Sequence, residues 1–131
     1  LWVGAGYGLY KIEPDGQQRS FPYNPKDPAA LPTYIVSAIQ EDADNQLWVG
    51  TAIGLNRIDR ATGKITRFVN DPKNPASLIG NEVYDLVLDA KQHLWVCSNK
   101  GLSRVDKTGD GIAFTHIAQR DGLPNDVVYG A

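Results

Sequence analysis

The 131-residue sequence contains no methionine, one cysteine and two histidines. The single cysteine, Cys97, cannot form an internal disulfide, so it says little about the redox compartment. His93 and His116 are the only histidines that could serve in a histidine-dependent catalytic triad, so such a triad is not favoured. No apolar run approaches the roughly 18 to 20 residues of a membrane-spanning helix. Because translation normally starts with methionine, we expect a chain that opens at Leu1 to be a processed or excised piece.

The charge balance is also modest. Lysine and arginine total 13 and aspartate and glutamate total 15, which gives a formal net charge of −2. No basic field is available to attract nucleic acid or an anionic membrane. We therefore expect no nucleic-acid partner.

The three tryptophans recur with nearly the same neighbours. The motifs are Leu1-Trp2-Val3-Gly4, Leu47-Trp48-Val49-Gly50 and Leu94-Trp95-Val96-Cys97. Their leading leucines stand at 1, 47 and 94, so the period is 46 or 47 residues. All three phenylalanines, Phe21, Phe68 and Phe114, also occur once per period. We expect these six aromatic residues to form the repeated core, with one tryptophan filling the wedge between neighbouring sheets.

Each period contains four short apolar or alternating runs separated by turn residues, and no sustained helical periodicity. Repeats of about 40 to 50 residues with four strands are typical of β-propeller blades. The sequence thus predicts an all-β fragment of a β-propeller with about three four-stranded antiparallel blades. The expected boundaries are an incomplete blade at 1–34, whole blades at 35–81 and 82–125, and a lone inner strand at 126–131.

Three blades are too few to close a ring, since propellers typically need four or more. Either further blades are missing, or copies of the chain close a ring together. Exposed sheet edges and apolar faces favour association. We expect the chain to form a homo-oligomer.

These residues resemble the two-component regulator propeller repeat. The resemblance is carried by Leu47 to Thr51, Gly54-Leu55, Arg57 to Asp59, Thr62-Gly63 and Phe68, and by the connecting segment Asp71 to Leu78 with Asn81 and Val83. It implies a blade group from the periplasmic or extracytoplasmic sensor region of a membrane-anchored bacterial receptor. Receptors of this kind include hybrid histidine kinases and diguanylate cyclases, whose output modules lie elsewhere in the chain.

A ligand surface is expected at one end of the propeller. Two sets of loops share that end: those joining the second and third strands of a blade, and those joining one blade to the next. The candidate residues are Tyr7, Ile53 and Lys100 from the first set and Tyr34, Asn81 and Asn125 from the second. These residues differ between repeats. Such variation is expected of a recognition surface, but it is also expected from sequence drift at solvent-exposed positions. The segment is expected to bind a small molecule, such as a sugar derivative or another nutrient, or to act as an interaction scaffold, and no cofactor is expected.

Other local patterns favour structural explanations. The string Asp106 to Gly111 resembles the start of a calcium loop, but it lacks the acidic twelfth residue and matches hairpin turns in the other repeats. Gly4 to Gly8 lies between two strands, which does not fit a phosphate cradle at a helix N-terminus. Cys97 is expected to be a buried small hydrophobe. We therefore expect no catalytic or metal-binding residue in this segment. The alternative is a propeller enzyme, such as a metal-dependent lyase of the streptogramin-inactivating type.

Overall fold

The structure is a computed structural model that describes residues 1–5, 8–21, 23–24, 26–27, 30–33, 35–108, 111–118 and 122. All regular secondary structure in these residues is β-strand. Three of the candidate ligand residues, Tyr7, Tyr34 and Asn125, and the expected strand 126–131 lie outside the described residues.

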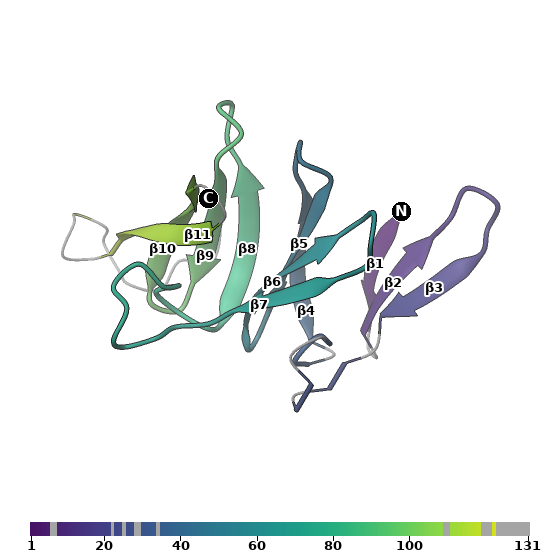
Figure 1. Ribbon diagram of the computed structural model, residues 1–131, viewed down its shortest axis with the longest axis horizontal. Helices are drawn as coiled ribbons and strands as arrows, with labels where there is room; N and C mark the ends of the chain where they lie inside the picture. Colours follow the sequence, from purple (N-terminus) through teal and green to yellow (C-terminus); the bar gives the residue numbers. More distant parts are fainter. Residues whose placement is uncertain are drawn as a thin grey trace.

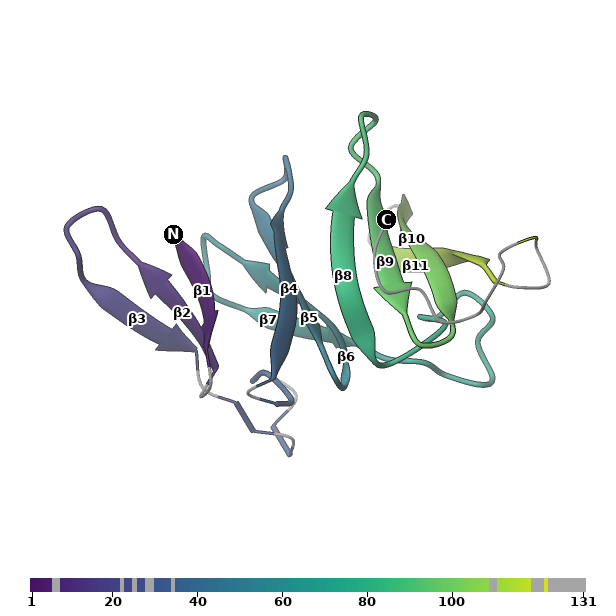
Figure 2. The same cartoon turned by 180° about the vertical axis from the view of Figure 1, so that it is seen from behind.

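The strands form three antiparallel sheets that follow one another in chain order (Figures 1 and 2). The first sheet has three strands and each of the others has four. Their bounds are β1 Trp2–Ala5, β2 Gly8–Ile12 and β3 Gln18–Phe21; β4 Val36–Glu41, β5 Gln46–Thr51, β6 Gly54–Asp59 and β7 Ile65–Phe68; β8 Val83–Leu88, β9 Leu94–Ser98, β10 Gly101–Thr108 and β11 Gly111–Ile117. The predicted all-β propeller-fragment architecture is confirmed.

Each four-stranded sheet is a simple meander, with every strand paired to its neighbours in sequence. Turn residues explain where the strands reverse. Asn45 adopts φ 62° in the β4–β5 turn, a left-handed conformation that asparagine tolerates better than most residues. Gly54 opens β6 with φ 100°, and an added Cβ there would lie 2.6 Å from the carbonyl oxygen of Phe68. Glycine is therefore required at this turn.

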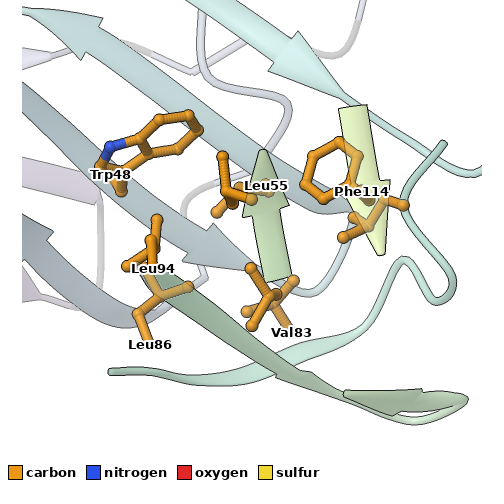
Figure 3. Packing of buried hydrophobic residues seen from close by; sticks show 9 residues of the cluster. Trp48, Leu55, Val83, Leu86, Leu94 and Phe114 are labelled. Atoms are coloured by element: carbon orange, nitrogen blue, oxygen red, sulfur yellow. The ribbon is translucent and has the colours of Figure 1, made fainter. Parts of the chain in front are cut away.

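Alternation along β5 explains how the sheets stack, because successive side chains of a strand point to opposite faces. Leu47 and Val49 pack in one cluster with Leu9 and Phe21 of the first sheet. Trp48 packs in a second cluster with residues of the third sheet, which include Val83, Leu86, Leu94 and Phe114 (Figure 3). The second sheet is thus apolar on both faces, as a blade between two others must be.

The three tryptophans occupy corresponding places. Trp48 is fully buried between the second and third sheets, and Trp2 packs against the cluster between the first and second. In β9, Leu94 and Val96 face the second sheet, so Trp95 lies on the other face of the third sheet, where it is half-buried. Trp2 and Trp48 therefore lie on the face that packs against the next sheet, and Trp95 lies on the corresponding face of the third sheet.

A cationic side chain of the neighbouring strand lies over each indole ring. Lys11, Arg57 and Arg104 are the direct cross-strand partners of Trp2, Trp48 and Trp95. Their charged groups lie 5.7, 5.7 and 5.9 Å from the ring centroids. Contacts of this kind stabilise a fold by roughly 0.5 to 1 kcal/mol at exposed sites. The sequence analysis missed this feature, although a basic residue stands nine positions after every tryptophan.

Neighbouring sheets approach closely where the tryptophan strand of one sheet meets the inner strand of the next. An added Cβ on Gly50 would lie 2.6 Å from Cγ1 of Val83, and one on Gly4 would lie 3.1 Å from Val36. The glycine two residues after the tryptophan is therefore a packing requirement between sheets. Cys97 takes this position in the third sheet, and its side chain is buried as expected.

The repeat assignment of Phe114 was wrong. Phe21 and Phe68 pair across their hairpins with Leu9 and Leu55, but Phe114 pairs with Val105. In the third sheet the repeat position of Phe68 belongs to Ile117, which is the partner of Leu102. The cause is a longer β10–β11 hairpin, which adds three residues to each strand beyond Val105 and Phe114. Phe114 consequently points back to the second sheet, where its ring contacts Phe68 edge-on at 5.9 Å.

We predict that Trp48→Ala lowers the free energy of unfolding by about 3 to 5 kcal/mol, because it opens a cavity between two sheets. Chemical denaturation measures the change. The control is Ile35→Ala, since Ile35 is 50% exposed and its loss is expected to change stability by no more than about 0.5 kcal/mol. Equal effects of the two substitutions would contradict the packing described above.

Candidate functional site

The described candidate ligand residues lie at one end of the stacked sheets. Ile53 is in the β5–β6 turn, Lys100 is in the β9–β10 turn, and Asn81 lies two residues before β8. The N–H of Gly54 donates to the carbonyl of Asn81 at 2.5 Å, and the N–H of Asn99 donates to the carbonyl of Glu82 at 3.1 Å. These two bonds bring both turns against the same connecting segment. The two loop sets therefore do share one end, as the sequence analysis expected.

The β5–β6 and β9–β10 turns are built in the same way. The hydroxyl of Thr51 accepts from the N–H of Ile53 at 3.1 Å and donates to the carbonyl of Gly54 at 3.0 Å. In the third sheet, Ser98 makes the equivalent bonds to Lys100 and Gly101, at 3.3 and 2.9 Å. A constant frame thus presents a different exposed side chain at each tip, isoleucine in one repeat and lysine in the next.

Asn81 stabilises the backbone at this end of the sheets. Its side-chain oxygen accepts from the backbone N–H of Asn70 at 2.7 Å, and the side-chain amide of Asn70 donates to the carbonyl of Leu78 at 2.9 Å. Asn81 therefore closes the connection between β7 and β8. A ligand contact would have to use the part of its side chain that this bond leaves exposed.

Residues 70–79 of that connection, called the strap below, lie against the outer strand of the third sheet. The N–H of Phe114 donates to the carbonyl of Ala76 at 2.8 Å, and Nε2 of His116 lies 2.5 Å from the carbonyl oxygen of Ser77. A cleft of about 740 Å³ opens between the strap and the third sheet. Its described lining residues are Asn70, Asp71, Pro72, Asn74, Pro75, Ser77, Ile79, Lys100, His116 and Ala118.

The preceding connection is held by the second sheet at the equivalent position. The guanidinium of Arg67 donates to the carbonyls of Asn24, Asp27 and Ala30 at 3.4, 3.0 and 2.9 Å. Arg67 precedes Phe68, and His116 precedes Ile117, which is the structural counterpart of Phe68. The sequence analysis missed this shared role because Arg67 and His116 differ in type.

The opposite end of the sheets carries a repeated aspartate. Asp42 accepts from the backbone N–H groups of Asp44 and Gln46, and its second oxygen accepts from the indole N–H of Trp48 at 2.8 Å. Asp89 repeats this pattern with Lys91, His93 and Trp95, and its bond to the indole is 2.9 Å. The bond between each of these aspartates and a tryptophan was not expected from the sequence.

These hydrogen bonds stabilise the charged carboxylates. The bond from Trp95 and the N–H of His93 lower the pKa of Asp89 from 3.8 to about 2. Burial by itself would raise the pKa of Asp42, but the bonds from Trp48 and two N–H groups, together with the charge of Lys107, hold it below its ordinary value.

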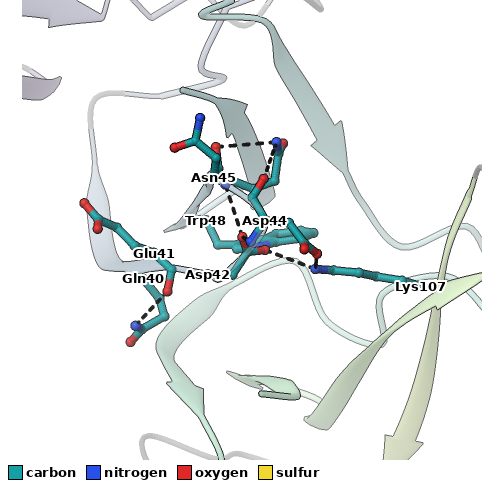
Figure 4. Close-up of polar contacts among 8 residues, drawn as sticks. Gln40, Glu41, Asp42, Asp44, Asn45, Trp48 and Lys107 are labelled. Atoms are coloured by element: carbon teal, nitrogen blue, oxygen red, sulfur yellow. Dashed lines mark hydrogen bonds and ion pairs between the residues drawn. The ribbon is translucent and has the colours of Figure 1, made fainter. Parts of the chain in front are cut away.

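Lys107 links the second and third sheets at this end. It extends from β10 and forms ion pairs with Asp42, at 3.3 Å, and with Asp44 (Figure 4). Desolvation alone would lower the pKa of Lys107, but these carboxylates raise it above its ordinary value. The extended β10–β11 hairpin of the third sheet therefore places a cation against two carboxylates of the second sheet.

The calcium-like string is part of that hairpin. Asp106 lies in β10, where it forms an ion pair with Arg104 at 2.8 Å and accepts a hydrogen bond from Thr115. Gly109 and Asp110 lie outside the described residues. Among the residues that the structure describes, no group of three or more histidine, cysteine, aspartate or glutamate side chains could hold a metal ion.

Cys97 has the character of a buried thiol. Burial, with a smaller contribution from the charge of Asp85, raises its pKa to about 11. The sulfur is therefore protonated at neutral pH, and a neutral thiol is a poor nucleophile.

Comparison with known proteins agrees with this architecture. Residues 30–52 and 77–100 match the family model described as "Two component regulator propeller". These two segments of the chain are similar to two-component regulator propeller repeats. Both matches contain a connecting segment, an inner strand and a tryptophan strand, which together form the joint between consecutive blades. No curated protein matches the chain.

Solved structures share the fold. The chain matches extracellular domains of two B. thetaiotaomicron proteins, which are assigned as the hybrid two-component system BT3049 and the one-component system BT4673. The TM-scores are 0.86 and 0.68, with 21% and 22% identity, and 98% of the chain is covered in each case. The chain spans only 18% and 16% of those two chains. These propeller repeats therefore correspond to a small part of each domain.

A lyase also shares the fold at a lower score. Virginiamycin B lyase from Staphylococcus aureus, in a catalytically inactive form with quinupristin, matches with a TM-score of 0.58 and 19% identity. The match covers 92% of this chain and 38% of the lyase chain. Within the described residues, no helix has the length and apolar character needed to cross a membrane.

We predict that the stability of these propeller repeats falls as the pH drops from about 4 to 2. A carboxylate whose pKa is lowered by folding contributes stability above its unfolded pKa, and this contribution is lost as the pH falls through the folded pKa. For Asp89 those limits are 3.8 and about 2. Asp89→Asn should weaken the acid dependence, measured by chemical denaturation at several pH values.

Asp15→Asn is the matched control, because Asp15 accepts only a turn N–H, from Gln17 at 3.0 Å. If the two variants show the same pH dependence as the parent chain, the bond between Asp89 and Trp95 does not couple folding to protonation.

Proposed function

We propose that the chain is a segment of the extracytoplasmic sensor propeller of a bacterial membrane-anchored signalling receptor, and that it takes part in binding a small ligand. The observation that carries this proposal is the 0.86 TM-score with the extracellular domain of BT3049, together with the two family matches. Two-component and one-component systems convert binding outside the cell into an output elsewhere in the receptor. On this view the segment itself performs no catalysis.

The binding surface in this proposal is the end that carries Ile53, Asn81 and Lys100. Its backbone is held by hydrogen bonds that recur between repeats, while the exposed tips differ. Binding residues are commonly presented in this way, on loops fixed by a rigid scaffold. Tyr7, Tyr34 and Asn125 complete the proposed surface. Blade boundaries at 34/35, 81/82 and 125/126, and self-association of the chain, belong to the same proposal.

The lyase fold match keeps one alternative open, a propeller enzyme such as a metal-dependent lyase. The higher TM-scores with the two extracellular sensor domains favour the receptor. An enzyme would convert a bound ligand, and a sensor would release it unchanged.

We predict that at least one member of a panel of monosaccharides, disaccharides, amino acids and dipeptides raises the melting temperature of the chain in a dose-dependent way, because a ligand bound to the folded state stabilises it. Differential scanning fluorimetry measures the shift. The double variant Ile53→Ala/Lys100→Ala should reduce the shift by about half or more, since it truncates both exposed tips.

Lys64→Ala is the control, because Lys64 lies in the β6–β7 turn at the opposite end of the strands. A panel without any stabilising member, or an equal loss of the shift in the control, would count against a ligand surface at this end. Chemical conversion of the bound compound, followed by mass spectrometry, would favour the enzyme.

A further inference from the structure

We propose that the cleft between the strap and the third sheet binds an acidic sugar, with Lys100 as the partner of the acidic group and His116 as the residue that positions the strap. This inference rests on the proposed sensing function and adds the site and the ligand class. The cleft, at about 740 Å³, lies in the range of small-molecule sites and has room for a sugar of one or two rings.

One wall of the cleft is rigid and carries positive charge. Lys100 sits in a two-residue turn whose backbone is fixed by Ser98, by Gly101 and by the bond from Asn99 to Glu82. Among the described residues, no carboxylate lies within 4.0 Å of the ammonium group of Lys100. A ligand carboxylate or sulfate would supply the missing partner, and such charge-assisted bonds are the stronger ones.

The other wall is the strap, and it offers neutral polar groups and one carboxylate. Asn74 uses its side-chain oxygen to hold the N–H of Ala76 at 3.0 Å, so its amide N–H groups remain as donors. Asp71, the one acidic residue among the described lining residues, has one oxygen engaged by the N–H of Lys73 at 3.0 Å. Its other oxygen remains as an acceptor. Neighbouring donors and acceptors suit hydroxyl groups, which act as both.

Apolar groups complete the lining. Pro72, Pro75, Ile79 and Ala118 also border the cleft. Sugar-sized ligands present C–H groups beside their hydroxyls, so a mixed lining of this kind matches them better than a purely charged surface would. A fully apolar ligand would leave Lys100 and Asp71 without compensation, and desolvating a charged group without a partner is costly.

His116 sets the distance between the two walls. Its ring nitrogen Nε2 bonds the carbonyl of Ser77, which ties the strap to β11. The equivalent residue in the second sheet, Arg67, makes three such bonds with a longer side chain. His116 is therefore a positioning residue, and an arginine in its place should also hold the strap.

The experiment titrates the chain with glucuronate, glucose 6-sulfate and glucose, using isothermal calorimetry and NMR shift mapping. We expect at least one acidic sugar to bind about tenfold or more tightly than glucose, because it adds a charge-assisted bond. Shift changes should centre on Lys100, His116 and Asn74. Lys100→Gln should remove the preference for the acidic sugar, while Lys73→Gln, on the same strap but outside the cleft lining, should keep it.

Hydrogen exchange tests the role of His116 separately. His116→Ala should speed the exchange of the Phe114 N–H, which bonds Ala76 of the strap, and should weaken binding of the acidic sugar. His116→Arg should restore slow exchange. A variant His116→Ala with unchanged exchange and affinity would overturn the positioning role.

The outcomes separate this inference from the proposed function. Shift changes confined to the opposite end, around Asp42 and Lys107, would leave a binding propeller but overturn the cleft. Equal affinities for glucose and both acidic sugars, or no binding of either acid while another compound raises the melting temperature, would overturn the ligand class. A lack of response to every compound would count against both.

Discussion

The structure depends on one repeated packing arrangement. An indole ring from the tryptophan strand lies on the face of its sheet that, in the first two sheets, packs against the next sheet. Trp48 shows it most completely, because its ring is buried against the third sheet while its N–H reaches Asp42. Arg57 covers the ring from the neighbouring strand. Burial, a hydrogen bond and a cation thus fix the same side chain. The glycine two residues later lets the next inner strand approach, so ring and gap together set the spacing of the sheets.

Under the proposed function, this arrangement would separate stability from recognition. The Asp42 and Asp89 networks and the ion pairs of Lys107 lie at one end of the strands, where they hold turns and link sheets. The turns with Ile53 and Lys100 lie at the other end, on backbone frames that are nearly identical. Side chains at these tips can change without disturbing the packed joint. A repeated scaffold with one variable end is well suited to a sensor domain that must recognise one compound among many.

Much of the fold could be predicted from the sequence, because large residues recur at a constant spacing. The tryptophan strands, the turns at Asn45 and Gly54 and the sharing of one end by two loop sets all follow from local patterns. For Phe114, the spacing along the sequence predicts the wrong position in the sheet. A longer hairpin moved the pairing by three residues, so a phenylalanine at a matching distance along the chain lies on the opposite face.

The candidate site was less predictable, since it depends on contacts distant in sequence. Arg67 reaches carbonyls about 40 residues earlier in the chain, and His116 reaches Ser77; nothing in their residue types links them. The cleft likewise forms only when the strap folds back on β11. By contrast, the bonds from Trp48 to Asp42 and from Trp95 to Asp89 span six residues in both repeats. That spacing was available in the sequence and could have revealed the network.

The most direct test of the packing account is hydrogen exchange of the three indole N–H groups, followed by NMR. The account predicts strong protection for Trp48, whose indole is buried and bonded to Asp42, and intermediate protection for Trp95, which is bonded to Asp89 but half-buried. Exchange of the Trp48 indole at the rate of a free indole, under conditions in which the strand amides remain protected, would contradict it.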